Sequence, residues 1–280
     1  MKFPLAVDEH KPGKPKVPTS FGIFYVFVSI LYLFTLTSLQ IMPFEALSLA
    51  SCILLGGFLG LVDDLMDLPW RVKAVIPLIG SLPLIALRQG HTLMATYFFG
   101  KVDFGIFYYI LIIPLIVTVT TNTVNMLGGL NGLETLGSLI VMVALAIASS
   151  QYILLLIPIL TLAVLAYYNF LGRIFVGNVG TFAFGITLAS YAIIMNIEQA
   201  LFISLTPFII NSLLILLSFF ILREKADTVM TEDNKLYSRK VRSLRSLILH
   251  YKPLTERQCV IAICTLILIS SIMGVLSAIL

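Results

Sequence analysis

Three carboxylates lie close together at the end of an apolar stretch. Asp63, Asp64 and Asp67 are followed within a few residues by Arg71 and Lys73. Carboxylates this close repel one another, so they need a cation, a proton or basic side chains nearby. A hard cation such as Mg²⁺ takes oxygen ligands of this kind, and the two basic residues offer a second source of positive charge. A solvated loop in which Asp67 ends a helix is the alternative interpretation.

A second polar group combines amides with glycines. Asn122 and Asn125 are three residues apart and share one face of a helix. A glycine pair that begins at Gly128 precedes Asn131-Gly, a turn in which backbone N–H groups can approach a ligand closely. The segment from Asn131 to Glu134 could start the next helix, whose dipole would favour a phosphate. A connection between two helices that needs only glycines and caps is the alternative.

A third polar group follows the aromatic run that starts at Tyr167. Gly177 and Gly180 bracket Asn178 in a tight loop before a helix start rich in small residues. This pattern fits a cradle for a phosphate or nucleotide, and it equally fits an ordinary turn.

These polar groups interrupt an unusually apolar chain. Of its 280 residues, 59% are hydrophobic and 11% charged, against about 25% charged in soluble proteins. The composition excludes a soluble domain, a disordered chain and a nucleic-acid-binding module. The apolar runs are too long and continuous for barrel strands, so we predict an all-α, polytopic transmembrane helical bundle, a single domain over residues 1–280. Its nine expected spans cover residues 20–40, 43–62, 72–88, 104–124, 133–150, 152–171, 180–197, 199–222 and 258–280.

The basic residues predict the orientation. Residues 1–20 are polar and contain no apolar segment typical of a cleavable signal peptide. With the N-terminus in the cytoplasm, 16 of the 18 Lys and Arg residues are cytoplasmic, and only Arg88 and Lys101 are outside. Residues 223–257 then form a basic cytoplasmic loop. All three polar groups lie on this same face, a combination that suits a charged, phosphorylated substrate.

These residues also carry a resemblance. The chain resembles the polyprenyl-phosphate N-acetylhexosamine-1-phosphate transferases, and within them the dolichyl-phosphate N-acetylglucosamine-phosphotransferase branch. The matching stretches occur in the same order over nearly the whole chain, and the Asp-Asp pair and Gly-Leu-Asn-Gly-Leu-Glu are the most specific of them. They are residues 8–11 with 13–15, 60–77, 103–109, 121–134, 168–185 and 253–257.

The resemblance implies roles for particular residues. It implies catalytic positions for Asp63, Asp64 and Lys73, the lysine contacting the pyrophosphate. It implies metal ligands at Asn125 and Asn178, with Mg²⁺ as the cofactor and Mn²⁺ as the alternative. Asn131 would hydrogen-bond the uracil of the sugar nucleotide. The substrate-binding residues that we expect are Lys11, Asp67, Asn122, Asn131, Glu134, Arg223 and Lys225.

Three features depart from the family pattern. Asn178 stands where the family usually has a metal-coordinating aspartate, which removes one anionic ligand. Gly128 stands where bacterial relatives often have Asp. The dolichyl branch also lacks this Asp. The family generally has ten spans, one of them before the region that matches residues 8–11. We therefore expect either that this protein does without that span or that the sequence starts late.

The expected activity is transfer of N-acetylglucosamine 1-phosphate, or a related N-acetylhexosamine phosphate, from a UDP-sugar to polyprenyl or dolichyl phosphate, with release of UMP. The expected location is the cell membrane, with the active site on the cytoplasmic face. A homodimer is one expected oligomeric state. A UDP-sugar- or lipid-binding homologue with little or no activity is one alternative, motivated by Asn178. A transporter is another, although no repeat is visible and the polar groups are not central. His10, His91 and His250 are isolated, and the first two are expected to face solvent.

Overall fold

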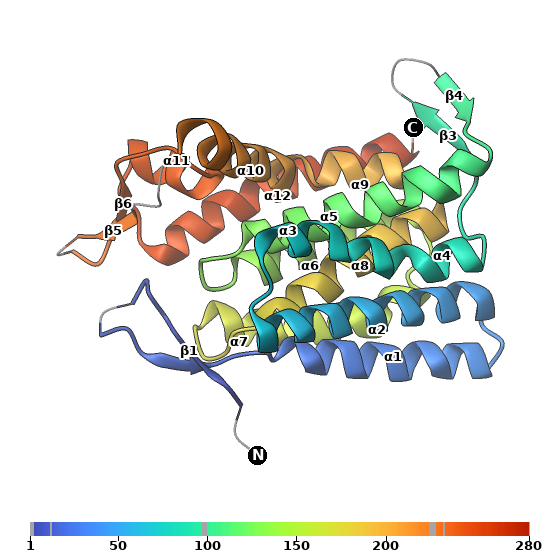
Figure 1. Ribbon diagram of the computed structural model, residues 1–280, viewed down its shortest axis with the longest axis horizontal. Coiled ribbons are helices and arrows are strands. Elements are labelled where there is room, and N and C mark those ends of the chain that lie inside the picture. Colours follow the sequence, from blue (N-terminus) through green and yellow to red (C-terminus); the bar gives the residue numbers. More distant parts are fainter. Residues whose placement is uncertain (1–2, 12, 97–99, 224–227, 232, 280) are drawn as a thin grey trace.

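The computed structural model describes residues 3–11, 13–96, 100–223, 228–231 and 233–279, and its helices run side by side in one bundle (Figure 1). The longer helices are α1 (Gly22–Ser38), α2 (Pro43–Met66), α5 (Ile113–Leu127), α6 (Leu133–Ser149), α7 (Leu156–Phe170), α8 (Gly177–Met195), α10 (Thr206–Leu217) and α12 (Glu256–Ile279). The shorter segments are α3 (Trp70–Val75), η1 (Ile76–Ser81), α4 (Leu82–Ala86), η2 (Tyr108–Ile112), η3 (Ile153–Leu155), α9 (Glu198–Ser204), η4 (Ser218–Leu222) and α11 (Leu244–Tyr251). The predicted all-α class is confirmed.

Among the described residues, five helical segments are long and apolar enough to cross a membrane. Helix α9 and the α10–η4 segment are bent by 59° at the break between them, and they make a sixth span if they are counted together. The apolar helices α1 and α6 are shorter than these. The predicted 72–88 run folds as three short pieces, because Pro77 and Pro83 stand in the first turns of η1 and α4, where proline supplies no N–H for a continuing helix. The chain is a multi-pass membrane protein, and the number nine stays a prediction.

Within the described residues, three small antiparallel hairpins lie at the ends of the bundle (Figure 1). The hairpin of β1 (Leu5–Val7) and β2 (Lys16–Pro18) shares one end with that of β5 (Thr228–Met230) and β6 (Leu236–Ser238) and with α11. The hairpin of β3 (Leu93–Thr96) and β4 (Gly100–Asp103) lies at the opposite end, near the C-terminus. The predicted basic loop 223–257 is therefore partly folded. The segments predicted to share the basic face gather at the β1–β2 end, and which side of a membrane this end faces stays a prediction.

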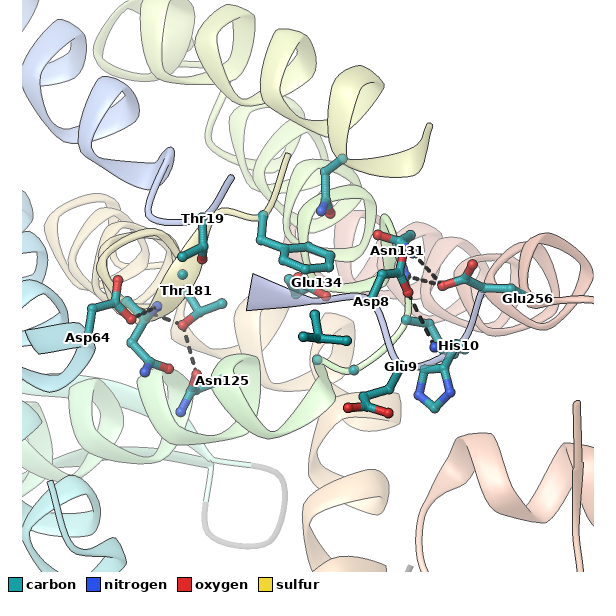
Figure 2. Close-up of a pocket in the computed structure, with 18 residues that line it drawn as sticks. Asp8, Glu9, His10, Thr19, Asp64, Asn125, Asn131, Glu134, Thr181 and Glu256 are labelled. Carbon is teal, nitrogen blue, oxygen red and sulfur yellow. Dashed lines mark hydrogen bonds between the residues drawn. The ribbon is translucent and has the colours of Figure 1, made fainter. Parts of the chain in front are cut away.

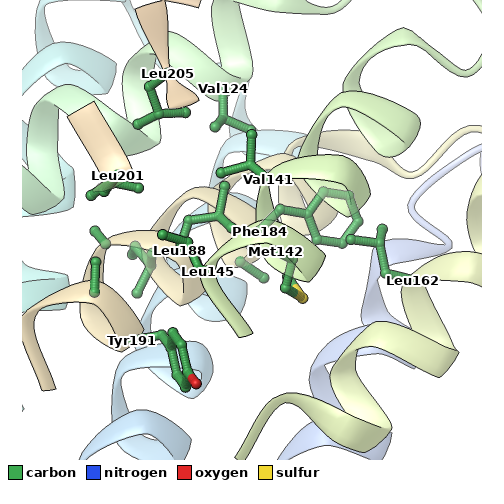
Figure 3. Packing of buried hydrophobic residues seen from close by; sticks show 14 of the residues in the cluster. Val124, Val141, Met142, Leu145, Leu162, Phe184, Leu188, Tyr191, Leu201 and Leu205 are labelled. Atoms are coloured by element: carbon green, nitrogen blue, oxygen red, sulfur yellow. The ribbon is translucent and has the colours of Figure 1, made fainter. Parts of the chain in front are cut away.

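Helix α8 forms the centre of the bundle. Every residue from Val179 to Ile194 is buried, as expected for a helix that is apolar on all sides. It packs most extensively against α2 and α5. Figure 3 shows Phe184 and Leu188 of α8 among apolar side chains of α6, α7 and α9. The backbones of α1, α2 and α8 approach closely at glycines: a Cβ on Gly60 would collide with the backbone of Asn178, and one on Gly22 with that of Gly180.

Gly60→Ala is expected to destabilise the bundle by about 1–3 kcal/mol, because the added methyl meets backbone that cannot rotate away. The measurement is thermal unfolding in detergent. Leu54→Ala, at an exposed position of the same helix, is the control and should change the unfolding temperature little. Equal effects of the two substitutions would contradict the close approach of α2 and α8.

Candidate active site

The carboxylate of Asp64 binds the N-terminus of the central helix. Its Oδ1 accepts the backbone N–H of Asn178 at 2.7 Å, and its Oδ2 accepts that of Val179 at 3.3 Å and the hydroxyl of Ser20 at 2.9 Å. The first N–H groups of a helix lack partners within the helix, and a negative charge there is favoured by the helix dipole. Gly177 has a φ of +68°, and a Cβ there would collide with Asp64, so glycine is required at this position.

Asp63 forms a separate ion pair. Its Oδ1 lies 3.0 Å from Nζ of Lys73 on α3 and accepts the N–H of Leu68 at 3.0 Å. Its Oδ2 is buried without a hydrogen-bond partner. Asp67 ends α2 in the left-handed region with a fully exposed side chain, 3.5 Å from the same Nζ. The predicted carboxylate cluster is thus divided: Asp64 faces α8, whereas Asp63 and Asp67 share Lys73.

A cavity of about 480 Å³ lies beside Asp64 (Figure 2). At this end, the hydroxyl of Thr181 on α8 donates to Oδ1 of Asn125 on α5 at 2.8 Å, and Asn178 also lines the wall. The lining comprises Val7, Asp8, Glu9, His10, Thr19, Asp64, Asn125, Gly128, Gly129, Leu130, Asn131, Glu134, Asn169, Phe175, Gly177, Asn178, Thr181 and Glu256. Residues of the second and third polar groups of the sequence therefore line the same cavity as Asp64.

The other end of the cavity is lined by the segment that follows β1 (Figure 2). There the amide of Asn131 donates to Asp8 and to Glu256, each at 2.8 Å. Lys11 lies 3.2 Å from Asp8. Behind them, the buried amide oxygen of Asn169 accepts the N–H of Gly132 at 2.9 Å, which fixes the turn before α6.

His10 and Arg245 join the β1–β2 segment to α11. Nη1 of Arg245 lies 3.3 Å from Nε2 of His10 and donates to the carbonyl of Gly129 at 2.9 Å. Burial, together with the Arg245 charge, lowers the pKa of His10 and favours the neutral ring. Because a guanidinium only donates, Nε2 of His10 accepts in this contact. The expectation that His10 is isolated and faces solvent was wrong. Its partner is 235 residues away in the sequence, a separation that local patterns do not reveal.

Of the twelve predicted site residues, Asp64, Asn125, Asn131, Glu134 and Asn178 line the cavity. Lys11 contacts the lining residue Asp8, whereas Asp63, Lys73 and Asp67 contact one another and do not belong to the lining. Asn122 instead donates to the carbonyl of Ala74 at 3.0 Å and ties α5 to α3. Arg223 is exposed at the end of η4, and Lys225 lies outside the described residues. From the described part of this loop, Arg245 contacts the lining residues His10 and Gly129.

The donor atoms at the Asp64 end suit a hard cation. One carboxylate and the amides of Asn125 and Asn178 are oxygen donors on a common wall. Mg²⁺ is commonly held by one or two carboxylates together with substrate phosphates and water. Within the part of the chain that the structure describes, no three His, Cys, Asp or Glu side chains cluster to form a complete site by themselves. The donor set therefore fits Mg²⁺ bound jointly with a phosphorylated ligand.

Several kinds of membrane enzyme are multi-pass helical bundles with a polar cavity at one end. Residues 46–196 match the family model described as glycosyl transferase family 4. This match covers α2, which carries Asp64, and all of α8, which Asp64 caps. The chain belongs to glycosyl transferase family 4 and is a membrane transferase.

Named relatives match most of the length of this chain. A protein of Saccharolobus solfataricus, provisionally named a UDP-N-acetylglucosamine–dolichyl-phosphate N-acetylglucosaminephosphotransferase, is 32% identical over 74% of this chain and 67% of its own length. A protein of Dictyostelium discoideum, named as the same transferase, is 28% identical over 90% of this chain and 76% of its own. A glycosyltransferase, also provisionally named, from Methanocaldococcus jannaschii is 26% identical over 99% and 88%.

Lys73→Met is expected to destabilise the protein by about 1–2 kcal/mol, because it leaves the buried Asp63 carboxylate without its counter-charge. The cost is below that of a fully buried pair, since the Lys73 side chain is 26% exposed. The double variant Lys73→Met with Asp63→Asn should recover part of the loss. Thermal unfolding can be followed through Trp70, the single tryptophan of the chain, on the same short helix.

Lys14→Met serves as the control, because the Lys14–Glu9 pair is largely exposed and should contribute little. No recovery in the double variant would show that Asp63 and Lys73 do not depend on each other.

Proposed function

We propose that this protein transfers N-acetylglucosamine 1-phosphate, or a related N-acetylhexosamine phosphate, from a UDP-sugar to polyprenyl or dolichyl phosphate. The names of the relatives supply the two substrates. The observation that supports it most directly is the polar cavity, which has Asp64 with the amides of Asn125 and Asn178 at one end and Asn131 at the other. The basic residues around this end favour a cytoplasmic active site.

In the proposed step, an oxygen of the lipid phosphate attacks the β-phosphorus of the UDP-sugar. A new P–O bond forms, the bond from the β-phosphorus to the bridging oxygen breaks, and its electron pair leaves with UMP. Both reactants are anionic, so the protein must position them and offset their charge. Arg245 supplies a cation at the cavity rim through its contact with Gly129, and Lys73, paired with Asp63 next to Asp64 in the chain, is assigned as a second cation. A lipid phosphate is already ionised near neutral pH, so Asp64 is assigned an organising role rather than that of a base.

The lipid is assigned to the surface beside Lys73. One turn before this lysine, Trp70 forms edge-on contacts with Phe219 and Phe220 of η4, with ring centroids 5.9 and 5.5 Å apart. All three rings are about half exposed. An apolar chain lying on these rings would bring its phosphate to Lys73, at the boundary between the apolar and polar parts of the surface.

Mg²⁺ would be held by Asp64, Asn125 and Asn178 together with the diphosphate, and it would neutralise charge on the diphosphate oxygens. The N–H donors of Asn178 and Val179 fix the Asp64 carboxylate in place before any ligand binds. Asn178 contributes no charge of its own, so the protein's contribution to cation affinity depends mainly on one carboxylate.

The direct test is UMP release by the purified protein in detergent with dolichyl phosphate, UDP-N-acetylglucosamine and Mg²⁺. Release should require both lipid and cation, and Asp64→Asn should lower kcat/KM by about 100-fold or more, because the organising charge is lost. Glu45→Gln, the same change at the far end of α2, is the matched control and should retain activity.

Absence of release with several UDP-sugars and lipids, while UDP still binds, would overturn the transferase in favour of a binding homologue. Full activity of Asp64→Asn would remove that residue from the mechanism.

Asn178→Asp is expected to tighten cation binding by about tenfold, because a second carboxylate joins Asp64. The measurement is titration of Mn²⁺, followed by electron paramagnetic resonance in the presence of UDP. Asn178→Ala should weaken binding relative to the unchanged protein. Identical affinities for all three proteins would place the cation elsewhere.

A further inference from the structure

A second, smaller cavity of about 120 Å³ lies between α10, the β5–β6 hairpin and the start of α11. It is at the same end of the bundle as the cavity that contains Asp64 (Figure 1). Among the described residues, none lines both cavities. The lining of the smaller one includes Lys240, Arg242 and Arg245, and no described carboxylate belongs to it. The cavity is therefore a separate and strongly basic site.

The walls of this basic cavity are held in place by hydrogen bonds within the protein. The N–H of Leu244, at the start of α11, donates to Oδ1 of the buried Asn211 on α10 at 3.0 Å. The hydroxyl of Ser243 caps α11 by accepting the N–H of Ser246 at 3.2 Å. The hydroxyl oxygen of Ser246 in turn accepts the N–H of Arg242 at 2.6 Å. The backbone that carries the basic side chains is therefore fixed before any ligand binds.

The two arginines of the basic cavity have unused hydrogen-bond donors. Nη1 of Arg245 donates to the carbonyl of Gly129 at 2.9 Å. Its Nη2 and both terminal nitrogens of Arg242 form no hydrogen bond within the part of the chain that the structure describes. The Nε atoms of both arginines are buried without a partner, whereas these three nitrogens retain access to solvent. A guanidinium only donates and stays charged, so these atoms are available to an anion.

The charges of the two arginines are not neutralised by an ion pair. No described carboxylate forms a salt bridge with either of them. Burial lowers the pKa of the Arg245 guanidinium, and the Arg242 charge acts in the same direction, whereas Glu256 opposes them by a smaller amount. Like charges held close together are unfavourable. A bound anion would offset this repulsion, and a guanidinium forms paired hydrogen bonds to a phosphate.

The size and position of the basic cavity favour a phosphate group. Its volume is below the range of about 300–1,000 Å³ that is usual for pockets enclosing a whole drug-sized ligand, so it admits only a small group. Three basic side chains suit the charge of about −1.5 to −2 that a phosphomonoester carries near neutral pH. Ile215 of α10 lines one side, and Leu213, Leu216 and Leu217 are exposed on the same helix. The cavity thus adjoins the apolar surface of a candidate membrane span, beside which lipid headgroups lie.

We propose that this basic cavity binds a phosphate group through Arg242 and Arg245, supplied either by the phosphomonoester headgroup of a membrane lipid or by free phosphate. The site goes beyond the proposed transfer reaction, because it lies outside the cavity that contains Asp64. Arg245 also contacts Gly129 at the rim of that larger cavity, so an anion bound here would hold the same side chain in place.

The test is calorimetric titration of inorganic phosphate and of dioctanoyl phosphatidic acid into the full chain in detergent. Arg242→Gln should weaken the binding of phosphate about tenfold, because a charged donor pair is lost. Arg242→Lys keeps the charge without the paired donors and should give an intermediate affinity. Arg239→Gln removes the same charge from an exposed residue outside the lining and should bind as the unchanged protein does.

The two probes distinguish the source of the phosphate. Phosphatidic acid that binds at least about tenfold more tightly than inorganic phosphate would assign a lipid headgroup, because its chains add contacts with α10. Equal affinities, both lowered by Arg242→Gln, would assign free phosphate. Dioctanoylglycerol has the same acyl chains without the phosphate and should not bind in a manner that depends on Arg242.

Chemical protection locates the anion without any substitution, and it serves if the Arg242 variants do not fold. Phenylglyoxal modifies accessible arginines, and peptide mass spectrometry reports the rate for each one. At about ten times its dissociation constant, a bound probe should slow modification of Arg242 about tenfold and leave that of Arg239 unchanged.

Four results would overturn the phosphate site. They are failure of both probes to bind, affinities for both probes that Arg242→Gln leaves unchanged, equal weakening by Arg239→Gln, and modification of Arg242 that neither probe slows. Binding of dioctanoylglycerol as tight as that of phosphatidic acid would show that only the chains are recognised, which also overturns it.

Discussion

The contact between the Asp64 carboxylate and the N-terminus of α8 is the constraint on which the rest of the site depends. Helix α8 is buried along almost its whole length, so its first N–H groups need an acceptor from the protein. Asp64 provides it from the end of α2, and the glycines at 60 and 177 let the two backbones meet. A carboxylate needed for folding thereby becomes a fixed charge in the wall of the cavity.

Some buried side-chain oxygens at or next to the site have no hydrogen-bond partner. They are Oδ2 of Asp63, Oδ1 of Asn131 and Oε2 of Glu134. Leaving such groups unpaired costs free energy, and native proteins keep few of them. Asn131 and Glu134 line the cavity, whereas Asp63 lies outside its lining and pairs with Lys73. The two unpaired atoms in the cavity wall are positions at which donors of a ligand or a cation would bind.

The cavity also joins segments that the sequence separates widely. The β1–β2 hairpin, the turn before α6 and the start of α12 meet at Asn131, and α11 reaches the same rim through Arg245. These contacts tie both terminal regions of the chain to the central helices at a single end of the bundle. The transferase site is thus a property of the assembled bundle, although the family match lies within residues 46–196.

The sequence by itself determined the membrane class, the apolar helices and the candidates Asp64, Asn125 and Asn178, because hydropathy and local spacing are read along the chain. It also placed Asn131 and Glu134 in a turn beside a helix start, as observed. Only the tertiary structure separated Asp63 from Asp64 and assigned Asn122 to a contact between helices. It also added Asp8, Glu256 and Arg245, whose side-chain contacts join segments more than 100 residues apart. Hydrogen bonds over such separations follow from how helices pack, and no local pattern records them.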